Sequence, residues 1–191
     1  MNKAIQINSL LIVLVILSSS VFKSQVLEQN LRVSKLLIEL GESPTEHHVA
    51  EIDSAKVRLG MEIATKGFTN LPDGSISLKV SEFFVCTDCH NTVKEIGLAS
   101  DNSADNRLAY AMEFDIPYLP GSTFWGMTNR TSWFNDDYVK KYGNLVEDAN
   151  KDLKKSIQLC SKECSSGRHL EDWEMEAILH YLASIELIVT D

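Results

Sequence analysis

The sequence predicts an all-α fold, because apolar residues recur at intervals of three and four in several stretches and only one short stretch alternates as a strand would. The 191 residues are enough for a single domain with a small extension. The composition, 44% hydrophobic and 24% charged, is ordinary for a globular protein. The formal net charge of −9 argues against nucleic acid and anionic membrane surfaces as partners.

The first 24 residues have the organisation of a secretory signal peptide. Lys3 supplies a positive start, residues 10–17 form an unbroken apolar run, and small residues follow at 18–20. We therefore expect cleavage near residues 20–25 and export to the periplasm. The apolar run is short for a membrane span, and the alternative is a membrane anchor that is not removed.

Two helices and one extended stretch are expected in the first half of the chain. Residues 25–48 form a helical extension and linker, with the helix over 26–40 and a glycine at its end. A second helix is expected over 49–66, and Gly60 in its apolar stripe allows another helix to approach closely. Residues 76–80 alternate between apolar and polar, as in a short strand or an extended approach to the residues that follow.

The second half of the chain predicts a long loop and two helices. Residues 98–135 lack helical spacing and are rich in Asn, Asp, Pro, Gly and aromatic side chains. A loop of that length inside a compact domain is usually functional. Apolar residues then recur at helical intervals over 144–164, which places Cys160 and Cys164 on the apolar stripe. A closing helix is expected over 170–187.

One motif carries the chemistry of this chain. Residues 86–90 read Cys-Thr-Asp-Cys-His, which is the spacing that covalent haem attachment requires. The thiols of Cys86 and Cys89 add to the two vinyl groups of the porphyrin, and His90 then lies beneath the iron as its proximal ligand. The sequence thus predicts one covalently bound haem c, with its iron, as the cofactor.

Three other interpretations of the motif explain less. A thioredoxin-like pair belongs to an alternating strand and helix pattern, which is missing here. A zinc site needs two more ligands at a similar spacing, and Cys160 and Cys164, with three residues between them, fit poorly. A disulfide between Cys86 and Cys89 leaves His90 without a role.

The motif, a preceding helix with Gly60 and a final helix that ends near Tyr181 resemble the monohaem cytochrome c domain. The resemblance covers roughly residues 49–187 and implies a cytochrome c-like helical domain over 49–191. In that family the first and last helices cross at a close contact between small residues. Gly60 and Tyr181 are the counterparts of that contact here.

The ligand on the other side of the iron sets the reduction potential and decides whether a substrate can bind. In cytochrome c domains this ligand is commonly a Met in a loop before the final helix. Here no Met lies between Met127 and Met175, and Met175 falls inside the final helix. The candidates for the distal position are therefore Met127, in the long loop, and Cys160.

The surroundings of Cys160 resemble a second group, the thiosulfate dehydrogenases and the SoxA-type sulfur-oxidising cytochromes. In that group a Cys in a helical segment after the haem motif ligates the iron, which implies the same role for Cys160. Ser156 stands where the group has Arg, and the stretch between His90 and Cys160 is longer. Arg130 and Arg168 are the candidates to supply the missing charge. The matching residues, in chain order, are Ile157, Cys160, Gly167, Glu174, Met175 and Tyr181.

Cys160 and Cys164 have a further alternative, because an oxidising compartment allows them to form a disulfide. Residues four apart in a regular helix are strained for that bond, although a helix end relaxes to allow it. The sequence leaves the disulfide and the ligand role of Cys160 both open.

Aromatic residues near Met127 are expected to line the porphyrin, and they are Tyr118, Phe124, Trp125, Trp133 and Phe134.

Two functions follow from these expectations. The first is an exported electron carrier, whose haem iron exchanges single electrons with redox partner proteins in the periplasm. The second is an oxidoreductase for thiosulfate or a related small sulfur compound, with Cys160 as distal ligand and a partner cytochrome to take the electrons onward. Export, one haem and the lack of a second redox motif favour the carrier. Membrane contact is expected only through a partner complex.

Overall fold

The computed structural model describes most of the chain from His47 to Ile185. The described residues are 47, 49, 51–95, 104–130, 132–134 and 136–185. The expected signal peptide over 1–24 and the expected helix over 26–40 lie outside them. All described residues belong to one unit of the chain, Thr45–Asp191.

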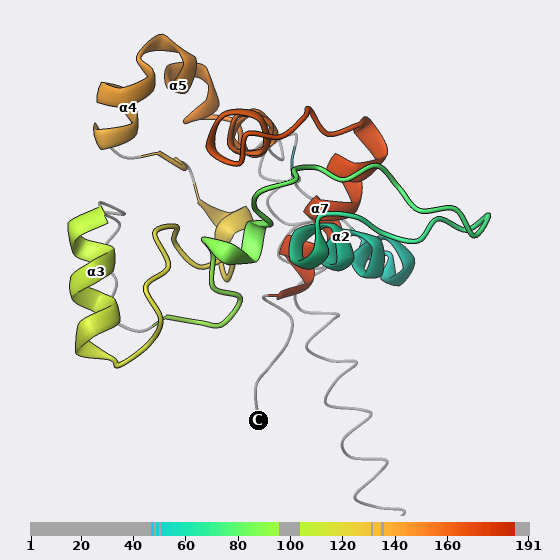
Figure 1. The fold of residues 1–191 in the computed structure, drawn as a ribbon, viewed down its shortest axis with the longest axis horizontal. Helices are drawn as coiled ribbons and strands as arrows, with labels where there is room; N and C mark the ends of the chain where they lie inside the picture. The colour runs from blue at the N-terminus through green and yellow to red at the C-terminus, as the bar shows by residue number, and fades with distance from the viewer. Residues whose placement is uncertain are drawn as a thin grey trace, which may run out of the picture. The chain divides into compact units, whose positions relative to one another are not determined.

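The described part of the chain is helical, which confirms the predicted all-α class (Figure 1). No strand forms among these residues, where one isolated bridge joins Asn70 to Ile76. Of the two expectations for residues 76–80, the extended approach is therefore observed and the strand is not. None of the described helices is long and apolar enough to cross a lipid bilayer. The elements are α2 (Ser54–Lys66), η1 (Cys86–Asp88), α3 (Ala104–Glu113), η2 (Met127–Asn129), α4 (Asp136–Tyr142), α5 (Asn144–Ala149), α6 (Leu153–Leu159), the π-helix η3 (Cys160–Cys164) and α7 (Asp172–Ile185).

Helix α2 begins at Ser54, five residues later than predicted. Asp53 sets this start, because its side chain accepts hydrogen bonds from the backbone amides of Ala55 at 2.8 Å and Lys56 at 3.3 Å. The apolar stripe continues upstream of Ser54 to Ile52, so the spacing of apolar residues cannot show where the helix begins. The helix ends at Gly67, whose φ of +78° is the left-handed conformation that glycine adopts without strain.

Helices α2 and α7 lie side by side, although they come from opposite ends of the described chain (Figure 1). Gly60 lies at their contact, since an ideal Cβ at that position would stand 2.1 Å from the carbonyl oxygen of Ala177. The predicted close approach at Gly60 is thus present. Its direct neighbour is Ala177, and Tyr181 lies one turn further along α7.

The helix predicted over 144–164 is three helices, so the prediction of one continuous helix was wrong. Helix α5 ends at Ala149, and α6 begins after Asp152, whose side chain accepts from the amide of Lys155 at 3.2 Å. The π-helix Cys160–Cys164 follows directly. The apolar stripe survives the break, and its buried members are Val146, Ala149 and Leu153.

Asn150, in the interruption between α5 and α6, is hydrogen-bonded to the segment before α4. The Oδ1 atom of Asn150 accepts hydrogen bonds from the backbone amides of Trp133 at 2.9 Å and Phe134 at 2.8 Å. The polar side chain at the interruption thus fixes the backbone of two aromatic residues.

Helix α3 lies within residues 98–135, which were expected to be loop, and corrects that expectation. Its position 107 is buried but is occupied by Arg107, whereas Leu108 and Met112 are exposed. Ala111 is buried as well, but the two large apolar side chains do not mark the inner face. This inversion explains why the spacing of apolar residues missed the helix.

Candidate haem site

A large pocket lies between α2, α6, α7 and the loops around η1 and η2. Its empty space is about 1140 Å³, the part open to solvent included. This is the scale of a cofactor site, since ligand pockets commonly measure roughly 300–1,000 Å³. Apolar side chains from the three helices form much of the wall, and they are Ile63, Ala64, Leu153, Ile157, Ile178 and Leu182.

The motif residues lie in one tight turn around η1. The carboxylate of Asp88 accepts from the amide of Val85 at 2.8 Å, and the amides of Cys89 and His90 donate to the carbonyl of Cys86 at 3.2 and 3.0 Å. This turn brings Cys86 and His90 to the pocket wall, of which Cys89 is not a part. Burial raises the pKa of the Cys86 thiol to about 11, so the thiol is protonated near neutral pH.

The imidazole of His90 is held in one orientation. Its Nδ1 lies 2.6 Å from the carbonyl oxygen of Ser122, and because a carbonyl only accepts, Nδ1 carries the proton and donates it. The ring stacks on Phe124 with centroids 4.7 Å apart. Burial lowers the pKa of His90, which favours the neutral ring. No described residue bonds to Nε2, so a neutral imidazole offers the pocket one free nitrogen, the form that ligates a metal.

Gly121 makes room for this ring. An ideal Cβ at Gly121 would lie 2.5 Å from Cε1 and 2.6 Å from Nδ1 of His90. The amide of Gly121 donates to the carbonyl of Cys89 at 2.8 Å, so the backbone is fixed where it approaches the ring. Sequence reasoning missed this residue, since a glycine in a long loop gives no sign of which side chain it faces.

Both predicted candidates for the distal position line the same pocket as His90. Met127 begins η2 and is 7% exposed, and Cys160 begins the π-helix. Gly126, with φ at +73°, allows the turn that brings Met127 inward. The structure thus unites three sequence-predicted residues from distant parts of the chain and keeps both Met127 and Cys160 as candidates.

The thiols of Cys160 and Cys164 contact each other across the π-helix. Both are free, in contrast to the disulfide alternative. The hydrogen bond between them raises the pKa of Cys160 well above its ordinary value, with burial adding to the rise. The same bond lowers the pKa of Cys164 to about 7, and Lys141 acts in the same direction. Cys164 is therefore the more acidic thiol of the pair and Cys160 the donor.

Of the two arginines considered for the site, Arg130 lines the pocket and Arg168 does not. Arg130 donates to Ser122 Oγ at 2.6 Å and to the carbonyl of Thr123 at 3.1 Å. Arg168 instead forms a bidentate pair with Glu174, at 2.6 and 2.7 Å, and donates to two backbone carbonyls upstream of η1. Arg168 thus holds the fold together, and the cation in the pocket wall is Arg130.

The aromatic wall differs in part from the expected one. Tyr118 is exposed, and Trp125 lies 4.8 Å beneath the ammonium group of Lys94, so neither lines the pocket. Tyr138, on α4, does line it and was missed, because in the seven residues of α4, which are mostly polar and aromatic, no apolar spacing marks the inner face. Burial is the main cause that raises the pKa of Tyr138 to about 12. The expected aromatic residues that do line the pocket are Phe124, Trp133 and Phe134.

These donors suit a haem better than a bare metal ion, although the second motif thiol, Cys89, is not part of the wall. Within the described residues, no three side chains of His, Cys, Asp or Glu gather to hold an ion. A haem iron takes four nitrogens from its porphyrin and needs only axial ligands from the protein. An apolar pocket whose wall carries a free imidazole nitrogen, the first thiol of the motif and further sulfur donors meets that need.

Comparison of the chain with protein-family models, with curated proteins and with solved structures gave no match in any of the three.

Proposed function

We propose that this chain is an exported c-type cytochrome that carries single electrons between redox partner proteins in the periplasm. One haem is bonded to Cys86 and Cys89, with His90 as the proximal iron ligand. The observation that carries the proposal is the state of His90, whose Nδ1–H donates a hydrogen bond to the carbonyl oxygen of Ser122 while its Nε2 has no partner among the described residues. That state, one residue after the second motif cysteine and at the wall of an apolar pocket, supports ligation.

The haem supplies a one-electron couple at its iron when it is bound. The chain's own residues orient the imidazole, keep water away and set the polarity of the pocket. The carbonyl of Ser122 accepts the hydrogen bond from Nδ1 of His90 and thereby makes the imidazole more basic. A more basic axial ligand stabilises the ferric state of the iron. The apolar side chains of α2, α6 and α7 act in the opposite direction, because a low-dielectric pocket disfavours the additional charge.

Arg130 supplies a cation at a site that is otherwise mostly apolar. A haem carries two carboxylates, and a guanidinium in the wall is the group that pairs with them most directly. The bonds from Arg130 to Ser122 and Thr123 hold the guanidinium beside the segment that faces His90. Arg130 would therefore support the binding of the haem carboxylates.

Mass spectrometry on the denatured protein tests this proposal. We expect protein matured with a c-type haem system to keep one haem through unfolding and acidic solvent extraction, since thioethers do not dissociate. Cys86→Ala and Cys89→Ala should each sharply reduce the covalent haem. Cys164→Ala is the matched control and should retain it. A wild-type mass equal to that of the bare exported chain contradicts the proposal.

A second candidate function is oxidation of thiosulfate or a similar small sulfur compound. The observation that favours it is that Cys160 and Arg130 line the same pocket. Cys160 could then ligate the iron, and Arg130 could attract an anionic substrate. In this case Cys160 is the distal ligand, and a partner cytochrome accepts the electrons one at a time.

Stopped-flow mixing of the ferric protein with thiosulfate separates the two functions. An oxidoreductase should be reduced in a saturable reaction that Cys160→Ser abolishes and Cys164→Ser leaves in place. A carrier should be reduced by a small inorganic donor and remain ferric with thiosulfate. The second result is the one we expect.

A further inference from the structure

The segment after the haem motif is joined to residues 119–124 by a series of hydrogen bonds. The amide of Phe124 donates to the carbonyl of Asn91 at 2.8 Å. The hydroxyl of Thr123 lies 3.1 Å from the carbonyl of Asn91 and 2.6 Å from that of Val93. Ser122, whose carbonyl accepts the Nδ1 proton of His90, is thus part of a backbone segment fixed on the motif side.

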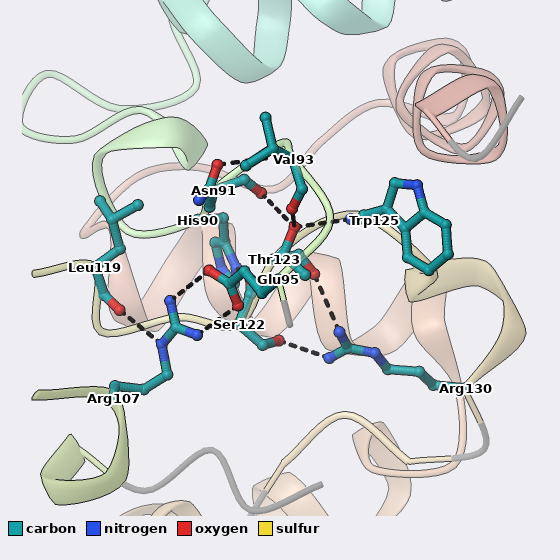
Figure 2. Close-up of polar contacts among 10 residues, drawn as sticks. All are labelled: His90, Asn91, Val93, Glu95, Arg107, Leu119, Ser122, Thr123, Trp125 and Arg130. Atoms are coloured by element: carbon teal, nitrogen blue, oxygen red, sulfur yellow. Dashed lines mark hydrogen bonds and ion pairs between the residues drawn. The ribbon is translucent and has the colours of Figure 1, made fainter. Parts of the chain in front are cut away.

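A buried ion pair closes the other end of this segment (Figure 2). The guanidinium of Arg107 donates to both carboxylate oxygens of Glu95, at 2.6 and 2.9 Å, and its Nε donates to the carbonyl of Leu119 at 2.9 Å. The exposed fractions of the two side chains are 1% for Arg107 and 2% for Glu95. Figure 2 shows the guanidinium directed between the carboxylate and the Leu119 carbonyl, three residues before Ser122.

Stability alone is a poor explanation for this pair. Removing two charges from water costs several kcal/mol per ion, and well-packed apolar side chains of similar volume often replace such pairs without loss. Arg107 is also the main buried anchor of α3, whose neighbouring residues Leu108 and Met112 are exposed. What a guanidinium offers and an apolar side chain does not is a rigid fork that fixes a carboxylate and a carbonyl at once.

We infer that Arg107, braced by Glu95, is a positioning residue for the proximal ligand. It holds Leu119 and hence the short run to Ser122, so that the Ser122 carbonyl stays in line with the Nδ1 proton of His90. The inference deepens the proposed function and rests on it. A firm Nδ1 hydrogen bond makes the imidazole a stronger donor, which stabilises the ferric iron and lowers the reduction potential.

The reduction potential of the haem-loaded full chain tests the inference. Arg107→Lys keeps the charge but loses the fork and the Nε donor, so the Ser122 carbonyl should drift and the potential should rise. We expect about a threefold shift of the redox equilibrium, which is roughly 30 mV for a one-electron couple at 59 mV per tenfold. Glu95→Gln keeps the shape of the side chain but removes its charge and so weakens its bonds to Arg107. It should raise the reduction potential by less than Arg107→Lys does.

Arg168→Lys is the matched control. Arg168 also makes a bidentate pair with a buried glutamate and donates to backbone carbonyls, but none of these bonds reaches residues 119–122. This variant should lower thermal stability and leave the potential where it is in the wild type. A purely structural role for Arg107 predicts the same behaviour for Arg107→Lys.

The outcomes are distinct. A raised potential in Arg107→Lys and Glu95→Gln, with an unchanged potential in Arg168→Lys, supports the positioning role. Potentials in the first two variants that match the wild type overturn it while the proposed function stands. A wild-type chain without covalent haem overturns the proposed function, and the inference with it.

Discussion

Gly60 of α2 lies directly against the backbone carbonyl of Ala177 in α7. A methyl group at position 60 would stand 2.1 Å from that oxygen and 2.9 Å from the amide nitrogen of Ile178. Backbone atoms cannot move aside as a flexible side chain can, so the spacing of the two helices depends on this glycine. The neighbours Ile63 and Ala64 both line the pocket, which therefore takes part of its width from the same contact.

Gly60→Ala should accordingly destabilise the fold. We expect the free energy of unfolding to fall by about 1–3 kcal/mol, the usual cost of overpacking, even though alanine is the better helix former. Chemical denaturation monitored by circular dichroism measures the change. Met61→Ala, next in the helix but on its exposed side, is the control and should alter stability by less than about 0.5 kcal/mol. Equal effects of the two substitutions contradict the close contact.

His180 should make stability depend on pH. Its Nδ1 accepts a hydrogen bond from the amide of Asp53 at 3.1 Å, which requires an unprotonated ring nitrogen. Burial is the first cause that lowers the pKa of His180 in the folded state, so below the ordinary value of 6.5 the unfolded chain binds more protons. Stability from this group is therefore present above pH 6.5 and is lost as the pH falls through the lowered pKa.

His180→Asn tests this dependence, because Asn offers an acceptor near the Nδ1 position and does not titrate. Urea unfolding at pH 7.5 and pH 5 should show a smaller loss of stability in the variant than in the wild type. An identical pH dependence in both proteins counts against the role of His180.

Thiol counting on the haem-loaded protein should find two reactive thiols after unfolding without reductant. The reason is that Cys160 and Cys164 are both free and in contact, while the proposed haem attachment would use the thiols of Cys86 and Cys89. Cys160→Ala and Cys164→Ala should each leave one. A count of zero in the wild type indicates a disulfide and excludes Cys160 as a thiolate ligand.

A spectrum of the oxidised protein should distinguish the two distal candidates. We expect a band near 695 nm only if Met127 ligates the iron, in which case Met127→Ala removes it and Cys160→Ala does not. If Cys160 ligates, Cys160→Met should raise the reduction potential, since a thiolate stabilises ferric haem. Either result is compatible with the pocket wall, which contains both side chains.

Asn150→Ala should loosen the aromatic wall. Its side-chain oxygen accepts from the amides of Trp133 and Phe134, and without it two partly buried donors are left unpaired. The expected loss is about 1–3 kcal/mol of unfolding free energy, with a faster exchange of both amides by NMR. Asn150→Asp keeps the acceptor and should retain most of the stability.

The fold was predictable where apolar spacing and burial agree. The closing helix was expected over 170–187 and lies at Asp172–Ile185, because Ile178 and Leu182 are both apolar and buried. Helix ends that are set by hydrogen bonds from polar side chains could not be predicted from the spacing of apolar residues. Asp53 starts α2 by capping, and Asn150 interrupts the predicted long helix by bonding to a distant segment.

The residues of the candidate site also fall into those that the sequence could identify and those that it could not. The motif and Cys160 could be named as candidates from the sequence, since their donor atoms lie in recognisable patterns, and Met127 could be named from its place in the long loop. Gly121 and Arg107 could not, because their importance lies in what they face across the fold. Glu95 and Arg107 in particular are charged side chains in a polar stretch, where exposure is the normal expectation.

The pairing of α2 with α7 also constrains the order in which the domain can be assembled. These helices begin at Ser54 and end at Ile185, and the amide of Asp53 is bonded to His180. During synthesis, which proceeds from the amino end, α2 must therefore wait until α7 has been made before it finds its partner. Until then the apolar face of α2 is accessible to chaperones and proteases. A truncation before Asp172 should for that reason yield degraded fragments, rather than a smaller domain that persists.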